Sequence, residues 1–204
     1  MHPNPTFRKT AADQDIAFLR DRSFGILTMN GEDTPMAAHI PFRLNEDASG
    51  VEAHLVRSNP IWRAIETPVT TKLMVSGGDA YVSPDWYGVD DQVPTWNYIA
   101  VHLTVRLYRL DQSKLRGILK RLSAQFEGRI EGKNPWTLGK MTPDVLEKME
   151  RQIVPIGMDI LDLQSTWKLG QNKPDAARLG AADGMETAPI GAEVGQISYA
   201  MRKV

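Results

Sequence analysis

The segment Thr95–Leu110 limits the possible folds of this chain more than any other, because its side chains alternate between apolar and polar over nearly its whole length. The apolar positions are Ile99, Val101, Leu103, Val105 and Leu107, and the positions between them include Tyr98, His102, Thr104, Arg106 and Tyr108. Successive side chains of a β-strand point to opposite faces, so this alternation predicts one long, half-buried strand. The fold is therefore expected to contain a substantial β-sheet.

Shorter β-rich segments, separated by turn residues, accompany this strand. The expected strands are Phe24–Asn30, Met36–Leu44, Val51–Arg57, Val69–Ser76, Ala80–Ser83 and Ile153–Leu163, with a turn at Gly77-Gly78. Apolar residues at helical spacing predict helices over 11–22, 113–127 and 143–151. Strands in this number with few helices predict an α+β fold dominated by β, in the form of a β-barrel with peripheral helices.

The chain shows no internal repeat and no Pro- or Ser-rich linker. The sequence therefore predicts one barrel domain over residues 1–175, with a helical insertion near 112–151. Residues 176–204 are rich in Ala and Gly and are expected to form a tail or short helices.

The composition excludes several classes of function. The chain contains no cysteine, so it has no disulfide, thiolate metal site, iron–sulfur cluster or cysteine nucleophile. Its 24 Lys and Arg residues nearly balance 25 Asp and Glu residues, and the net charge of -1 does not favour non-specific binding to nucleic acid. Residues 1–25 lack the apolar run of a secretory signal, and no uncharged stretch around the aromatic centre is long enough for a membrane helix. A cytoplasmic protein is the expectation.

The segment 51–65 contains a strand that ends at Arg57 and a helix start directly after it. Asn59 suits the N-cap position and Pro60 the first helical position. The unpaired N–H groups of a helix start, together with Arg57 and the hydroxyl of Ser58, could bind an anion or a phosphate group. Caps of this kind are common, so these residues alone favour a capped helix beside a solvated arginine.

Aromatic residues concentrate between positions 81 and 98, where five of the fifteen in the chain lie. A cluster of this kind, which includes Trp86 and Trp96, is more typical of a core or a subunit interface than of a wall against a planar cofactor. After the last predicted strand, Lys168, Gln171 and Asn172 offer a cation and two amides to a phosphate or carbonyl group. Such residues are also ordinary in loops.

Other common sites lack their motifs. The four histidines, His2, His39, His54 and His102, do not have the spacing of a zinc site. No dinucleotide-binding motif, phosphate-binding loop or hydrolase nucleophile elbow is present. No general acid or base stands out, so no catalytic residue is assigned.

In these same segments the chain resembles the PaiB-type family of FMN-binding negative transcriptional regulators, which belongs to the FMN-binding split-barrel superfamily. The resemblance extends from the N-terminus to about residue 175. It rests on Met1, Pro3 and Pro5; His54-Leu55, Arg57 and Asn59-Pro60 to Trp62; Ala80–Pro84 and Trp86-Tyr87; Val93–Tyr98 and Ala100–His102; Ile153-Val154; and Lys168-Leu169 with Gln171-Asn172. The chain departs from the family at Gly170, where a serine is expected, and at Pro155-Ile156-Gly157, which interrupts the usual strand.

The resemblance implies a homodimeric split β-barrel that binds FMN in a cleft formed by both subunits. It implies that the FMN phosphate lies at the end of the strand 51–57, and it makes the aromatic cluster part interface and part flavin wall. The residues expected to contact the cofactor are His54, Arg57, Ser58, Asn59, Trp86, Trp96, Asn97, Lys168, Gln171 and Asn172. No metal ligand is expected.

Three functions remain open at this point. The first is a flavin-dependent oxidoreductase or a flavin-responsive regulator. The second is a DNA-associated negative transcriptional regulator, whose best feature is the basic helix face of Lys114, Arg116, Lys120 and Arg121; the predicted helices lie too far apart for a helix-turn-helix, so direct DNA binding is not favoured. The third is a haem-binding split barrel with His54 or His102 as the axial ligand.

Overall fold

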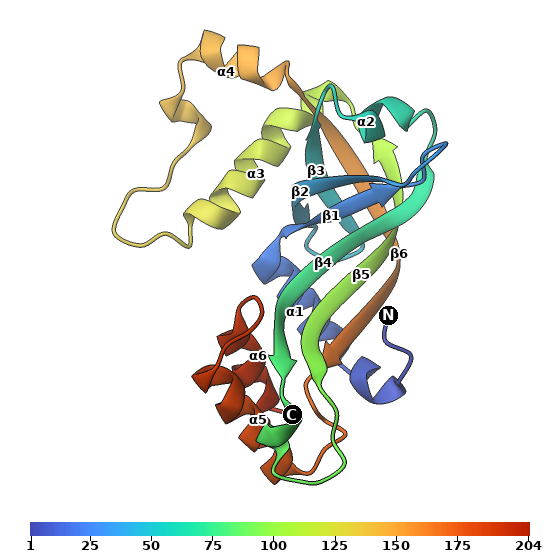
Figure 1. The fold of residues 1–204 in the computed structure, drawn as a ribbon. Helices are drawn as coiled ribbons and strands as arrows, with labels where there is room; N and C mark the ends of the chain where they lie inside the picture. The colour runs from blue at the N-terminus through green and yellow to red at the C-terminus, as the bar shows by residue number, and fades with distance from the viewer. The chain divides into compact units, whose positions relative to one another are not determined.

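Six β-strands close into a barrel in the order β1-β2-β3-β6-β5-β4 in the computed structural model, which describes residues 1–204 (Figure 1). The strands are β1 (Phe24–Met29), β2 (Met36–Leu44), β3 (Gly50–Val56), β4 (Val69–Val82), β5 (Thr95–Arg109) and β6 (Ile153–Lys168). The predicted β-dominated split barrel is therefore confirmed.

Helices interrupt and follow the strands. The α-helices are α1 (Ala12–Arg22), α2 (Pro60–Ala64), α3 (Leu115–Glu127), α4 (Pro143–Glu150), α5 (Asp175–Thr187) and α6 (Val194–Met201). Short 3₁₀ helices are η1 (Pro5–Arg8), η2 (Pro84–Tyr87), η3 (Gln112–Lys114) and η4 (Leu138–Lys140). Not one of the helices combines the length and the apolar character that crossing a membrane requires.

Two compact units make up the chain. Unit 1 contains residues 1–17, 75–102 and 164–204, and unit 2 contains residues 18–74 and 103–163. In unit 2, β1 pairs antiparallel with β2 and with β4, and β3 pairs antiparallel with β2 and β6. The helix α3 packs against β2 and β3 of the same unit.

The alternating apolar side chains of β5 are buried, as the sequence predicts. All five apolar positions of this strand are at most 2% exposed. In unit 2 the core also includes fully buried side chains from the other strands, namely Leu27, Phe42, Ala53, Leu73, Val154 and Ile156. Because an alternating strand places one set of side chains on a single face, the sequence pattern was enough to define this part of the core.

The predicted turn at Gly77-Gly78 is wrong, because both residues lie within the continuous strand β4. The structure gives another reason for a glycine at position 78. A Cβ atom there would lie 2.8 Å from the carbonyl oxygen of Glu193, and the N–H of Gly78 donates to Gln196 Oε1 at 2.7 Å. Gly78 therefore permits close packing of the C-terminal segment instead of a reversal of the chain.

The segment Pro155-Ile156-Gly157 also lies within a continuous strand, so the expected interruption does not occur. Pro155 stands opposite His54 in the β3–β6 pairing. A Cβ atom at position 157 would lie 2.6 Å from the ring of Tyr108, so the glycine provides the space for this ring. The strand β6 continues five residues beyond its predicted end, to Lys168.

The segment after residue 174 forms the helices α5 and α6, which pack against each other within unit 1. Small side chains at the contact surface, Ala177, Ala181 and Ala182, are at most 1% exposed, as is Ile197 of α6. The high Ala content therefore allows close approach of helices.

Candidate functional site

The end of β3 carries four of the predicted cofactor contacts, and all of them belong to unit 2. The predicted cap is confirmed, since Asn59 precedes Pro60 at the start of α2 and its side chain accepts a hydrogen bond from the N–H of Ile61 at 2.9 Å. The helix α2 has only five residues. Pro60 has no N–H group and Ile61 already donates to Asn59, so this helix start offers few donors to an anion.

Arg57 follows β3 and uses its guanidinium group within the protein. Its Nε donates to the carbonyl oxygen of Arg151 at 2.7 Å, and its Nη2 lies 3.4 Å from the carbonyl oxygen of Ile153 and 3.3 Å from Gln112 Oε1. The main-chain N–H of Arg57 also donates to the carbonyl oxygen of Gln152, at 2.8 Å. Arg57 therefore holds the start of β6 in place, a role that the sequence did not indicate.

His54 lies in β3 between the core residues Ala53 and Leu55, so its side chain is on the opposite face of the strand. Its Nδ1 atom is buried and has no hydrogen-bond partner. Burial lowers the pKa of His54, so the imidazole is neutral at pH 7. A buried polar atom without a partner is rare in folded proteins and is the type of atom that a bound ligand can satisfy.

Two lysines of unit 1 lie near each other: Lys168 is the last residue of β6, and Lys173 lies in the turn that follows it. Lys168 Nζ donates to Thr95 Oγ1, and Lys173 Nζ donates to Gln92 Oε1 and lies 5.1 Å from the ring centroid of Tyr87. Burial, and secondarily the charge of Lys173, lowers the pKa of Lys168. An anion placed near both ammonium groups would relieve their repulsion.

The predicted contact Gln171 has both ends of its amide engaged in the turn after β6. Its Oε1 accepts from the N–H of Leu169 at 2.8 Å and its Nε2 donates to the carbonyl oxygen of Trp167. Gly170, which precedes Gln171, has a φ of +80°. This conformation favours glycine over the serine expected from the family. Asn172 is exposed.

The predicted aromatic contacts differ in their surroundings. The indole of Trp86 packs over α5, where a Cβ atom at Gly184 would lie 2.3 Å from its Cγ atom. Trp96 is 45% exposed, and Tyr81 makes edge contacts with both tryptophans. In unit 1, Trp86 and Trp96 thus both contact the ring of Tyr81.

Asn97 is 1% exposed, and its Nδ2 atom lies 3.3 Å from the sulfur of Met201 in α6. Its side chain is therefore engaged by the C-terminal helix. The sequence interpretation missed Met201, as it missed Thr95, Gln92 and Lys173. For Lys173 a signal was present, since it lies five residues after Lys168, in the turn that follows β6.

Residues 1–162 match a protein family described as "Putative FMN-binding domain". The chain belongs to this family. The chain is also 31% identical over 169 residues to the "Protease synthase and sporulation protein PAI 2" of Bacillus subtilis, a match that covers 82% of this chain and 80% of the relative. The family resemblance expected from the sequence is therefore confirmed.

Solved structures agree on the fold of this FMN-binding family member. The FAD and haem binding protein of Mycobacterium smegmatis superposes with a TM-score of 0.59 at 15% identity and covers 91% of this chain and 82% of its own. The flavocytochrome Anf3 of Azotobacter vinelandii gives a TM-score of 0.58 at 13% identity, with 82% and 72% covered. At these identities the likeness supports the barrel fold alone.

The chemistry of the residues present fits FMN, the cofactor that the family implies. His54 has a buried nitrogen that lacks a partner, and Arg57 carries a permanent positive charge three residues further on. Unit 1, considered by itself, contains two further cations, Lys168 and Lys173. Hydrogen-bonding groups and cations of this kind are what a phosphate and a polar flavin ring require.

Proposed function

We propose that the chain binds FMN with the residues at the end of β3 and acts as a flavin-dependent oxidoreductase or a flavin-responsive regulator. The observation that carries the proposal is the match of residues 1–162 to a family of FMN-binding domains. In the structure, the buried Nδ1 atom of His54, which has no hydrogen-bond partner, also supports the proposal. Bound FMN would supply a ring that accepts and donates electrons, and the chain would supply its position and surroundings.

In this proposal Arg57 and Ser58 hold the phosphate group. The Nε and Nη2 atoms of Arg57 contact Arg151, Ile153 and Gln112, which fixes the plane of the guanidinium and leaves Nη1 for a phosphate oxygen. An arginine held in this way loses little additional conformational entropy when an anion binds. Ser58 is exposed beside it and offers a hydroxyl donor.

His54 would contact a polar atom of the cofactor with its neutral imidazole. A neutral ring presents one N–H donor and one acceptor nitrogen, so it can serve either type of partner. Asn59 would act through the cap of α2, and Asn97, Trp86 and Gln171 would act by shaping unit 1. Trp96, Lys168 and Asn172 remain as proposed direct contacts.

Titration of the apo-protein with FMN, followed by flavin fluorescence, tests the phosphate contact. The variant Arg57→Ala should weaken FMN binding by roughly ten- to a hundredfold, which corresponds to about 1.5–3 kcal/mol for a hydrogen bond to a charged group. Lys114→Ala removes a positive charge of the 3₁₀ helix η3 and should leave the affinity unchanged.

Because Arg57 also holds β6, the melting temperature of each variant is measured as well. The variant Arg57→Lys keeps the charge but loses the planar fork, so it should recover part of the affinity. Tight FMN binding by the parent and equal binding by Arg57→Ala would place the phosphate elsewhere.

Haem is the second candidate ligand, because His54 offers an unpaired imidazole nitrogen and one structural neighbour is described as binding both FAD and haem. His102 is the other axial candidate from the sequence. The absorbance spectrum of the purified protein separates the two ligands: a flavin band supports FMN and a Soret band supports haem.

Regulation by direct DNA binding receives little support from the basic face of α3. Arg116 forms a bidentate ion pair with Glu150 at 2.9 and 2.7 Å, and Arg121 forms one with Glu52 at 2.7 and 2.6 Å. Two of the four cations on this face are therefore neutralised. We expect little binding to duplex DNA in gel shifts at physiological salt, and sequence-selective binding at nanomolar concentration would contradict this.

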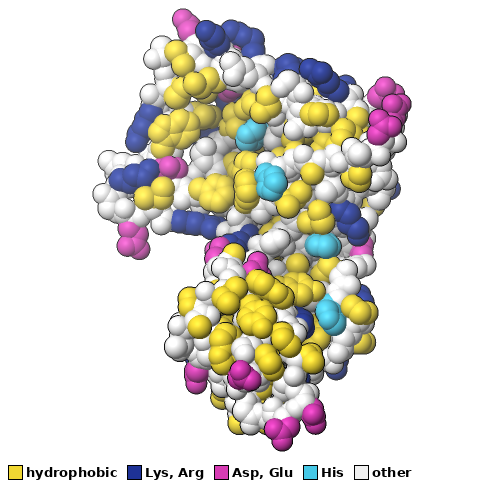
Figure 2. All heavy atoms as spheres, viewed as in Figure 1, with side chains coloured by type: hydrophobic (Ala, Val, Ile, Leu, Met, Phe, Trp, Pro, Cys, Tyr) yellow, Lys and Arg dark blue, Asp and Glu magenta, His cyan; other side chains and the backbone are white.

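A homodimer and a cytoplasmic location complete the proposal. Unit 1 exposes large apolar side chains, with Val93 at 73%, Tyr199 at 64% and Ile190 at 54% exposure. On the face shown in Figure 2, hydrophobic side chains gather over α5 and α6. Apolar groups of this size favour burial against a second subunit.

A further inference from the structure

Four arginines line one hollow of unit 2, on the outside of the barrel. The hollow has a volume of about 430 Å³ and is lined by Arg20, Arg43, Arg121, Ala124, Gln125 and Arg129. Arg20 comes from α1, Arg43 from β2 and Arg121 from α3, and Arg129 follows α3 closely. No acidic side chain is part of the lining.

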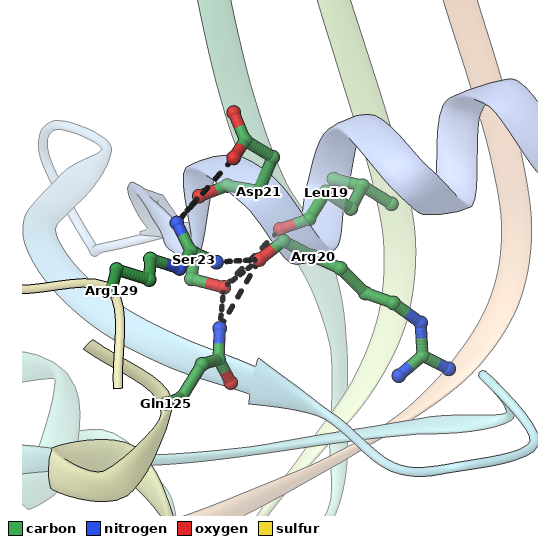
Figure 3. A network of polar contacts seen from close by, with 6 residues as sticks. All are labelled: Leu19, Arg20, Asp21, Ser23, Gln125 and Arg129. Atoms are coloured by element: carbon green, nitrogen blue, oxygen red, sulfur yellow. Dashed lines mark hydrogen bonds and ion pairs between the residues drawn. The ribbon is translucent and has the colours of Figure 1, made fainter. Parts of the chain in front are cut away.

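The arginines are held in place by groups of the protein. Arg20 Nη2 donates to the carbonyl oxygens of Asn45 and Glu46 at 3.0 and 2.8 Å. Arg129 donates to the carbonyl oxygens of Asp21 and Arg20 at 2.6 and 2.8 Å, as Figure 3 shows. Carbonyl groups fix these guanidinium groups without cancelling their charge.

Two carboxylates form ion pairs with three of the four arginines. Glu52 makes the bidentate pair with Arg121 and lies 3.7 Å from Arg43. Asp21 lies 3.4 Å from Arg129, and its side chain is 74% exposed, so this pair is weak. Four positive charges against two negative ones leave a local charge of about +2, in a chain whose net charge is -1.

We propose that this arginine hollow binds a small molecule with a phosphate or diphosphate group. A local charge of +2 matches a phosphate dianion, and guanidinium groups bind phosphate oxygens with two parallel hydrogen bonds. The volume falls within the roughly 300–1,000 Å³ of small-molecule sites. A concave site suits a compact anion better than the convex backbone of duplex DNA.

The arginine hollow is separate from the proposed FMN phosphate site. Glu52, which pairs with two of the arginines, and Arg57 are five residues apart along β3 and its end. At about 3.3 Å per residue, an extended chain places them about 16 Å apart. The hollow and the proposed phosphate site therefore share no lining residue, and the FMN titration described below tests whether they are independent.

Calorimetric titration of the full chain with inorganic pyrophosphate, in a buffer free of phosphate, tests the proposal. The parent should bind pyrophosphate saturably, and Arg43→Gln should weaken binding by about tenfold or more, as expected for the loss of one charged hydrogen-bonding partner. Arg43 is the substitution of choice because Arg121 still pairs with Glu52 in the variant. The matched control, Arg106→Gln, removes the same charge from an exposed position on β5 and should change the affinity less than twofold.

Three further measurements test whether the loss of pyrophosphate binding is specific to the hollow. The melting temperature of Arg43→Gln should stay within a few degrees of the parent, and Arg129→Gln should weaken binding as Arg43→Gln does. FMN affinity of the apo-protein should be the same in Arg43→Gln and the parent, and loss of FMN affinity would show that the hollow is the flavin site. Absence of saturable binding at millimolar pyrophosphate, an equal effect of Arg106→Gln, or displacement of pyrophosphate by a stoichiometric amount of duplex DNA would overturn the proposal.

Discussion

Arg57 combines an observed role with a proposed one, because the guanidinium group that we propose binds phosphate also joins the strand end to Arg151 and Ile153. Its removal is therefore expected to affect both ligand binding and the local structure. This is why the charge-preserving variant and the melting temperature belong to the same experiment. The Nδ1 atom of His54 has no partner in the protein, so this nitrogen has no structural hydrogen bond to lose.

Gly170 is a residue whose backbone conformation explains its identity. Its φ of +80° lies in the left-handed region, where a side chain is strained. We expect Gly170→Ala to lower the free energy of unfolding by about 1–2 kcal/mol in urea denaturation. The control is Gly195→Ala in α6, where nothing lies within 4 Å of the added methyl group. This variant should raise the stability by about 0.5–1 kcal/mol, and equal effects of both variants would contradict the conformational explanation.

The carboxyl group of Asp15 in α1 is buried, and its titration makes the stability of the folded protein depend on pH. The residue is 2% exposed, and Trp167 Nε1 donates to it at 2.7 Å. Burial raises the pKa of Asp15, and the hydrogen bonds from Ser165 and Trp167 counteract this rise only in part. The folded state thus binds a proton more tightly than the unfolded state does, and this carboxylate lowers stability as pH rises through the raised pKa.

We therefore expect Asp15→Asn to melt at a higher temperature than the parent at pH 7, with the difference narrowing as the pH falls below the pKa of Asp15. Thermal denaturation across a pH series measures this difference. The asparagine can still accept the hydrogen bond from Trp167, which makes it a suitable neutral replacement. A lower melting temperature of Asp15→Asn at every pH would show that the charge itself is stabilising.

The helix α3 is joined to the rest of unit 2 both by apolar packing and by hydrogen bonds. Its buried residues Leu115, Ile118 and Leu122 face the barrel, and the helix packs on β2 and β3. Near its C-terminal end, Gln125 Nε2 donates to the carbonyl oxygen of Arg20 at 3.1 Å and to the hydroxyl of Ser23 (Figure 3). Ser23 itself has a positive φ of 46°, so this junction between α1 and β1 depends on its polar contacts.

Replacement of Gln125 by Ala should therefore destabilise unit 2 by about 1–2 kcal/mol, because a carbonyl oxygen and a hydroxyl lose a donor. Hydrogen exchange should increase for the amides at the end of α1 and the start of β1. Lys120→Ala, at an exposed position of the same helix, serves as the control and should leave exchange in that junction unchanged. Unaltered exchange in Gln125→Ala would mean that the backbone alone maintains the junction.

At the scale of the whole molecule, the exposed apolar side chains of unit 1 bear on the oligomeric state. We expect light scattering to give twice the chain mass of 22.8 kDa at micromolar concentration. Val93 is 73% exposed, and Val93→Asp should shift the mass toward the monomer. Val145→Asp changes a 45% exposed valine of α4 and should leave the dimer intact. A monomeric parent would contradict both the dimer and a cofactor cleft shared by two subunits.

Sequence patterns predicted those parts of the fold whose determinants are close together along the chain. The alternation of Thr95–Leu110 predicted β5 and its buried face, and Asn59-Pro60 predicted the start of α2. The absence of cysteine excluded whole classes of chemistry, and the segments around His54, Trp96 and Lys168 indicated the family. The strand, the helix start and the family were predicted from a periodicity, a helix cap and short motifs, respectively.

The tertiary structure decided whatever depends on residues far apart in the chain. The sequence suggested a turn at Gly78. The glycine is instead required by the close approach of Glu193 and Gln196, which lie over one hundred residues away in the chain. The Arg151 carbonyl that accepts from Arg57 is 94 residues away, and the sulfur beside Asn97 is 104 residues away. The four arginines of the hollow come from three elements and the segment after α3, so none of them stands out locally. Backbone propensity and side-chain period act between near neighbours, whereas packing, ion pairing and the charge of a site arise only when the folded chain brings distant residues into contact.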